Sequence, residues 1–270
     1  MSGRLVVEVA GVSIEVVGAD TTALRSVLGD VLTPDDAPAE RVVDLGDAGP
    51  SGVETVLAAV ARAAVEPARG LLLHAGAVVR DGRAVLFPGA SGQGKSTLTA
   101  ACLQQGFDYL SDELVAVDLD TGTVTGWPRP LMLTPWSAAT LGLDGADGAE
   151  GVAAVGAGKT AVAAAALGAA PVRSSVEVAH VVLARRDGGA APPVPVAAGD
   201  VLREVLAASF NHYVHGARAW QAAARLAGSA HGWLLGVGDV ATAADAVAAL
   251  LDGSGAAAWP EGSGAGGPPA

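Results

Sequence analysis

A glycine-rich loop with a single lysine constrains this chain more than any other feature. The segment FPGASGQGKSTLTAA places Gly89, Gly94, Lys95 and Ser96 in the spacing G-x-x-x-x-G-K-S, which is typical of a loop that cradles phosphate groups. The chain has two lysines, Lys95 and Lys159, so this composition rarely produces the pattern by chance. The apolar run AVLFPG predicts a strand before the loop, and STLTAACLQQG predicts a helix after it. This strand–loop–helix context predicts a phosphate-binding loop.

The residues of the loop suit a nucleoside triphosphate. Its glycines allow successive backbone N–H groups to point at an anion, and the following helix adds the positive end of its dipole. Lys95 would reach the β- and γ-phosphates, and the Ser96 hydroxyl would bind Mg²⁺. We therefore expect ATP and Mg²⁺ as cofactors. The residues expected to contact the nucleotide are Gly89, Ser91, Gly92, Gln93, Gly94, Lys95, Ser96 and Thr97.

A pair of adjacent carboxylates follows the helix. Asp112 and Glu113 come directly after the apolar run FDYL, which predicts a strand that ends beside the loop. Two carboxylates at a strand end can divide the work of phosphoryl transfer, one orienting the metal and the other accepting a hydroxyl proton. Taken alone, the pair is equally consistent with an acidic turn between two strands.

Composition excludes several classes of protein. The formal net charge of -12 leaves no basic face for a nucleic acid. The single cysteine, Cys102, excludes a disulfide framework and fits a reducing compartment. The first residues lack the pattern of a signal peptide, and the longest apolar run, Thr160–Val172, is too short to span a bilayer. We expect a cytoplasmic protein without a nucleic-acid or membrane partner.

The chain divides into three predicted regions. Residues 1–67 predict a small α/β unit, residues 68–251 the main domain, and residues 252–270 a disordered low-complexity tail. Hairpins are predicted around Gly11 and at Asp81-Gly82. Two later helices are predicted with Asp200 and Asp239 as N-caps. Between residues 136 and 195 the sequence predicts little beyond a buried strand, VEVAHVVLAR.

One stretch of the main region resembles a known family. The run LLLHAGAVVRDGRAVLFPGASGQGKSTLTAACLQQGFDYLSDELVAVD closely resembles the HPr kinase/phosphorylase family, and especially its smaller relatives that phosphorylate a serine of ribosomal peptide natural products, the lasso peptide tailoring kinases. The shared features are His74, the glycine loop of residues 89–96, and the pair Asp112-Glu113. The resemblance extends weakly to WPRPLMLTP and to the C-terminal FNHYVHGARAW and GWLLGVGDVATAADAV.

The resemblance implies a fold and an activity. The fold would be α/β, an HPr-kinase-like P-loop fold in which helices flank a mixed sheet, joined to the small N-terminal unit. Asp112 would be the base that activates a serine hydroxyl, and His74 would lie near the transferred phosphate. Glu113 would help Ser96 hold Mg²⁺, although Asp112 and Glu113 are interchangeable as base and metal ligand. The expected partner is a serine-bearing peptide or small protein, and the hexameric kinases of the family point to a homo-oligomer.

The chain also departs from the bacterial HPr kinases. It carries Asp-Glu where they carry Asp-Asp. Counterparts of their long N-terminal domain and of their phosphorylase-related signature are not recognisable. These differences argue against HPr as the substrate and against the reverse phosphorylase reaction.

Several residues outside this stretch are further site candidates. Arg129, held between two prolines, and Arg218 are candidates for stabilising charge on the γ-phosphate, and a surface position is as good an interpretation of each. His212 and His215 have the spacing of a zinc pair but lack a recognisable third ligand. Lys159 is interpreted as a loop lysine, with contact to a phosphate or the substrate as the alternative. Four tryptophans are interpreted as core or groove wall: Trp127, Trp136, Trp220 and Trp233.

Two alternatives to a peptide kinase remain from the sequence. The same fold could phosphorylate a small metabolite, which predicts a closed pocket with convergent charges. A non-catalytic module that binds nucleotide and recruits a peptide is the other alternative. The presence of Lys95, Ser96, Asp112 and Glu113 together favours a kinase over this module, which has no need of all four.

Overall fold

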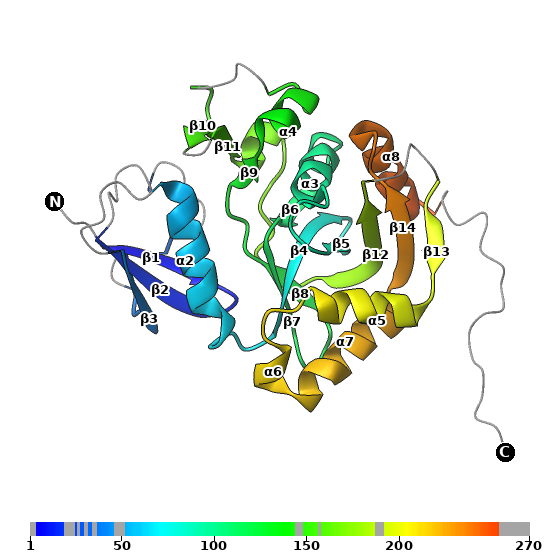
Figure 1. The fold of residues 1–270 in the computed structure, drawn as a ribbon, viewed down its shortest axis with the longest axis horizontal. Helices are drawn as coiled ribbons and strands as arrows, with labels where there is room; N and C mark the ends of the chain where they lie inside the picture. Colours follow the sequence, from blue (N-terminus) through cyan, green and yellow to red (C-terminus); the bar gives the residue numbers. More distant parts are fainter. Residues whose placement is uncertain are drawn as a thin grey trace.

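The chain folds as a mixed α/β protein, as predicted. The computed structural model describes residues 4–18, 25, 28–29, 32–33, 37–45, 52–143, 148–155, 158–186 and 192–253, so most of the predicted disordered tail lies outside the described residues. A large mixed sheet lies at the centre with helices on both faces, and a smaller three-stranded sheet lies beside it (Figure 1).

The N-terminal unit contains the predicted hairpin, together with a third strand and a helix. Strands β1 (Leu5–Val9) and β2 (Val12–Val17) form the expected antiparallel hairpin, and β3 (Arg41–Asp44) pairs parallel with β2. Helix α2 (Val53–Val65) buries its apolar side in the same core. This core also takes in Leu72, Leu114 and Trp127 of the main region, so the two regions share one apolar cluster.

The central sheet has the strand order β13-β14-β12-β5-β4-β7-β8, and β6 also pairs with β4. Strand β12 is parallel to β5 and to β14, whereas β4 is antiparallel to β5, β6 and β7. The hairpin predicted at Asp81-Gly82 is confirmed, because this turn joins β4 to its antiparallel partner β5. The strands are β4 (Leu71–Arg80), β5 (Arg83–Pro88), β6 (Asp108–Ser111), β7 (Leu114–Val117), β8 (Val124–Gly126), β12 (Glu177–Arg185), β13 (Val194–Val196) and β14 (His231–Gly236).

Helices cover the two faces of this sheet because its strands are apolar on both sides. Val85 and Phe87 of β5 pack in the cluster of α3 (Lys95–Gln104) and α8 (Val240–Leu251). Leu86 of the same strand packs in the cluster of α5 (Ala198–Ala207) and α7 (Ala217–Ser229). The short α6 (His212–His215) precedes α7. No helix in the described ranges is long and apolar enough to cross a bilayer.

One of the two N-cap predictions is confirmed. Asp239 caps α8 by accepting from the backbone N–H groups of Ala241 and Thr242. The prediction for Asp200 is wrong, because α5 begins earlier and its N-cap is Ala197. Asp200 lies in the first helical turn, where its side chain accepts from Arg203 at 2.8 Å.

The region that the sequence left undefined forms a second small sheet with the order β10-β11-β9. The strands of this sheet are β9 (Leu131–Leu133), β10 (Val152–Val155) and β11 (Lys159–Val162). The same part of the chain also forms α4 (Pro135–Thr140) and the 3₁₀ helix η3 (Ala164–Leu167). Lys159 therefore begins a strand and does not lie in a loop. The reason is the pairing of β11 with β9, a partner distant in sequence that the local Ala-rich pattern does not reveal.

Candidate active site

The glycine loop connects β5 to α3, as predicted. Gly92 (φ 84°) and Gly94 (φ 93°) have left-handed backbone conformations that side chains disfavour, and Gly94 is the N-cap of α3. A Cβ atom on Gly89 would collide with the side chain of Gln93. The first N–H groups of α3 have no intrahelical partner, as in any helix, so the loop presents donors to an anion.

Lys95 is the first residue of α3, and its side chain turns back toward the loop. Its side chain is almost fully buried, and Nζ donates to the backbone oxygen of Ala90 at 2.7 Å. Burial lowers the pKa of Lys95, and the nearby carboxylates Glu113 and Asp112 oppose that decrease by favouring the ammonium. The positive charge of Lys95 is thus held close to the acidic pair.

Asp112 is buried, at 2% exposed, and only one of its two carboxylate oxygens has a polar partner among the described residues. Oδ1 accepts from the Tyr109 hydroxyl at 3.0 Å and lies 3.4 Å from Nη2 of Arg129. Oδ2 is buried and has no hydrogen-bond partner among the described residues. Burial, followed by the charge of Asp112, raises the pKa of Tyr109 well above its usual value, so the phenol remains a donor.

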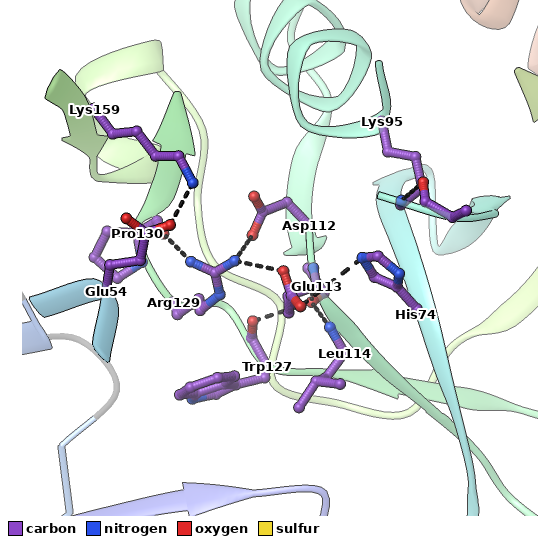
Figure 2. A network of polar contacts seen from close by, with 12 residues as sticks. Glu54, His74, Lys95, Asp112, Glu113, Leu114, Trp127, Arg129, Pro130 and Lys159 are labelled. Atoms are coloured by element: carbon purple, nitrogen blue, oxygen red, sulfur yellow. Dashed lines mark hydrogen bonds and ion pairs between the residues drawn. The ribbon is translucent and has the colours of Figure 1, made fainter. Parts of the chain in front are cut away.

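Arg129 ties the two carboxylates together (Figure 2). Its Nη2 donates to Glu113 Oε2 at 2.9 Å as well as approaching Asp112. Burial alone would lower the pKa of Arg129, but the two carboxylates raise it above its ordinary value. On the other side of Glu113, Oε1 lies 3.8 Å from Nε2 of His74. Burial, then the charge of Lys95, lowers the pKa of His74, which favours the neutral imidazole.

Strand β4 brings the loop and the acidic pair together. His74 pairs with Leu114 of β7, while the next residue, Ala75, pairs with Pro88 of β5. The backbone oxygen of His74 also accepts from the N–H of Gly89 at 3.3 Å. Because β4 separates β5 from β7, the glycine loop begins on one side of His74 and the acidic pair lies on the other.

One cleft of about 450 Å³ is lined by the glycine loop, His74, Arg129 and the pair Asp112-Glu113. Both lysines of the chain line it, and Lys159 forms an ion pair with Glu54 of α2, so the N-terminal unit supplies one wall. The cleft therefore holds several charges of each sign. Its lining comprises Glu54, Leu57, Ala58, Ala61, His74, Ser91, Gly92, Gly94, Lys95, Ser96, Thr97, Asp112, Glu113, Arg129, Met132, Thr134, Trp136, Ser137, Lys159 and Arg186.

Arg186 lines the cleft although the sequence does not predict it as a site residue. It directly follows β12, and its Nη1 donates to the backbone oxygen of Gly92 at 3.2 Å. Strand β12 runs parallel to β5, with Val181 opposite Leu86, so their carboxyl ends meet at the edge where the glycine loop starts. The sequence signal was the arginine that directly follows VEVAHVVLAR, but the pairing of this strand with β5 could not be read from the sequence.

Some candidates lie elsewhere. Arg218 is exposed on α7 and pairs with Asp120 at 2.9 Å, away from the cleft lining. Gly89 and Gln93 support the loop without lining the cleft.

His212 and His215 lie on α6, where the His215 ring contacts Asn211 and the backbone oxygen of Ala68. The tryptophans divide as follows: Trp127 and Trp233 are buried, Trp136 lines the cleft, and Trp220 is exposed on α7.

The donor set fits Mg²⁺ bound together with phosphates. Within the described ranges no group of three or more His, Cys, Asp and Glu residues is placed to hold a metal ion. Ser96, Asp112 and Glu113 nevertheless line the same cleft, and Asp112 keeps one oxygen without a protein partner. Mg²⁺ usually takes one or two protein carboxylates and completes its six ligands with phosphate oxygens and water.

The chain matches no protein-family model and no curated protein.

Proposed function

We propose that the chain is an ATP- and Mg²⁺-dependent kinase that transfers the γ-phosphate to a hydroxyl group. One observation carries this proposal: Asp112, in the same cleft as Lys95, is buried and keeps one carboxylate oxygen without a partner among the described residues. An unpaired buried carboxylate oxygen is costly and therefore indicates a role in binding or proton transfer. Its position opposite a phosphate-binding loop favours phosphoryl transfer.

The residues suggest how the step would proceed. The acceptor oxygen forms a bond to the γ-phosphorus while the bond to the β,γ-bridging oxygen breaks, and ADP leaves. Asp112 Oδ2 takes the proton of the acceptor hydroxyl. Lys95 and Arg129 stabilise the charge on the phosphoryl oxygens. Mg²⁺, when held by Ser96 and Glu113, would neutralise charge on the β- and γ-phosphates. Asp112 and Glu113 can exchange these roles, because both line the cleft.

We propose a serine of a peptide or small protein as the acceptor, on the strength of the resemblance described above. The wall opposite the loop suits such a chain, since Leu57, Ala58 and Ala61 of α2 offer it an apolar surface. The convergence of charges from Glu54, Lys159 and the acidic pair also favours the second candidate, a small charged metabolite that bears a hydroxyl.

The test is phosphate transfer from Mg-ATP to a pool of peptides with terminal or internal serines, read by mass. We expect Asp112→Asn to lower turnover about 10²- to 10⁴-fold while ATP binding is retained. Lys95→Ala should weaken ATP binding itself. Asp120→Asn, which changes an exposed carboxylate outside the cleft, is the matched control and should leave both unchanged.

The outcomes separate the candidates. Transfer to peptide that Asp112→Asn does not slow would contradict the assigned base. ATP consumption with a metabolite extract and not with peptides would identify the small-molecule kinase. ATP binding without turnover on either would leave the non-catalytic nucleotide-binding module.

A further inference from the structure

Trp136 is a large aromatic residue of the cleft that phosphoryl transfer does not use. Its side chain is 56% exposed although it lines the same cleft as the glycine loop. Its place in the cleft distinguishes Trp136 from an ordinary exposed tryptophan, because there its aromatic face is available to a ligand bound beside the glycine loop. The charged groups assigned to the transfer step lie instead at the buried end, with Lys95 at 4%, Asp112 at 2% and Arg129 at 5% exposed.

Two contacts fix Trp136 relative to the glycine loop. It lies in the first turn of α4, whose N-cap Thr134 accepts from the backbone N–H of Ser137 at 3.2 Å. The Ser137 hydroxyl is hydrogen-bonded to the Thr97 hydroxyl of α3 at 2.8 Å. Thr97 lies two residues after Lys95, so this pair of hydroxyls attaches α4 directly to the helix that follows the loop.

Arg186 connects Trp136 to the other side of the loop. Its guanidinium carbon lies 5.7 Å from the centre of the Trp136 ring, while Nη1 donates to the backbone oxygen of Gly92. Arginine beside an indole face strengthens the binding of a flat ligand through cation–π attraction and stacking. The indole and the guanidinium together form a platform of one aromatic and one cationic plane at the exposed end of the loop.

The geometry points to this platform as the nucleoside subsite, and we propose that the base stacks on Trp136 with Arg186 beside it. The inference rests on the proposed function, in which the loop binds a triphosphate. A nucleoside triphosphate is an unbranched chain with the γ-phosphate at one end and the nucleoside at the other. When the γ-phosphate lies at the buried carboxylates, the nucleoside therefore lies toward the exposed end of the loop, where Trp136 is found. Any base offers a flat face to the indole, and purines offer the larger one.

The test compares ATP with inorganic triphosphate, which lacks the nucleoside. Binding of each is measured by titration calorimetry with Mg²⁺ for the full chain, Trp136→Ala, Trp136→Phe and Trp220→Ala. We expect Trp136→Ala to weaken ATP about 10- to 100-fold, the effect of losing one base–aromatic stack, and to leave triphosphate affinity unchanged. Trp136→Phe, which keeps an aromatic face, should recover most of the loss.

Trp220→Ala is the matched control, because Trp220 is 55% exposed on α7 and lies outside the cleft lining. It should change neither affinity. Unchanged ATP affinity in Trp136→Ala, or an equal loss for ATP and triphosphate, would overturn the subsite while the proposed function stands. Failure of the unaltered chain to bind either ligand would overturn both.

Discussion

The guanidinium of Arg129 is nearly buried between Asp112 and Glu113, so removing it leaves a buried carboxylate without its counter-charge. We expect Arg129→Met to lower the free energy of unfolding by about 3–5 kcal/mol, as for other broken buried ion pairs. Urea denaturation measures this loss. The exposed pair Arg218–Asp120 is the matched control, and Arg218→Met should cost less than about 1 kcal/mol.

A double variant separates charge from packing at this pair. Arg129→Met together with Asp112→Asn removes both charges, and it should be more stable than Arg129→Met alone. Equal losses for Arg129→Met and Arg218→Met would contradict the assigned role of the buried pair.

His180 makes stability depend on pH. Burial, together with the charges of His231 and Arg83, lowers the pKa of His180 to about 4, and the ring accepts from Trp233 Nε1 at 3.0 Å. In the unfolded chain the pKa of His180 is near 6.5, so as the pH falls the unfolded state takes up the proton before the folded state does. Stability therefore falls as the pH drops from about 6.5 to about 4. Between pH 7 and pH 5 this one residue should remove about 2 kcal/mol of unfolding free energy.

His180→Gln is the variant that checks this dependence, because glutamine keeps an acceptor for Trp233 and does not titrate. Urea denaturation at pH 7 and pH 5 gives the two free energies for each protein. The difference between the two pH values should be about 2 kcal/mol smaller in the variant. An identical difference in both proteins would show that His180 is not responsible.

Single residues were predictable where the chemistry lies in one continuous stretch. The structure brings Lys95, His74, Asp112 and Glu113 to the same cleft, because they lie in or next to neighbouring strands of one sheet. Arg129 also lies there, a position that its two prolines alone did not specify. Arg186 was not predicted, and for Trp136 the sequence left core and groove wall open, since the approach of both residues depends on strand pairing and helix packing across long sequence separations.

At the scale of elements, Asn211 attaches the segment before α6 to two other parts of the chain. It is fully buried, and Oδ1 accepts from the N–H of Leu72 in β4 at 2.8 Å. Nδ2 donates to the backbone oxygens of Gly70 and Val65 at 3.0 and 3.2 Å. One amide side chain therefore provides hydrogen-bond partners for three backbone groups in the segment where α2 leads into β4.

Asn211→Ala should destabilise the protein by about 3 kcal/mol, because it leaves several buried backbone groups without partners. Urea denaturation measures the effect. Ser229→Ala, which removes one hydrogen bond at an exposed helix end, should cost less than about 0.5 kcal/mol. A similar small cost at both positions would show that water replaces the amide of Asn211.

Elements with a strong period or a clear turn were predictable from the sequence. The hairpin at Gly11, the helix after the glycine loop and the strand VEVAHVVLAR all form as expected. The elements α4, β10 and β11 were not recognised, because alanine- and glycine-rich segments carry little periodicity and acquire their structure from the partners they pair with. The specific P-loop kinase fold stays a prediction beyond the mixed α/β architecture.

At the scale of the whole molecule, the predicted boundary after residue 67 divides one apolar cluster. Leu72, Leu114 and Trp127 of the main region pack with the core of the N-terminal hairpin, and α2 supplies a wall of the cleft. A shared core predicts that the two regions unfold together, even though each has its own sheet.

Ile14→Ala tests this coupling from the far side of the boundary. Ile14 is fully buried in β2, and its truncation should cost about 2–5 kcal/mol through lost burial and a residual cavity. Hydrogen exchange read by mass should then show an equal loss of protection in α3, beside the glycine loop, if the molecule opens as one unit. Val42→Ala, at an exposed position in the same small sheet, is the control and should change neither region. A loss of protection confined to β1, β2, β3 and α2 would show that the N-terminal unit opens alone, and the cleft would then lose its α2 wall while the glycine loop stays folded.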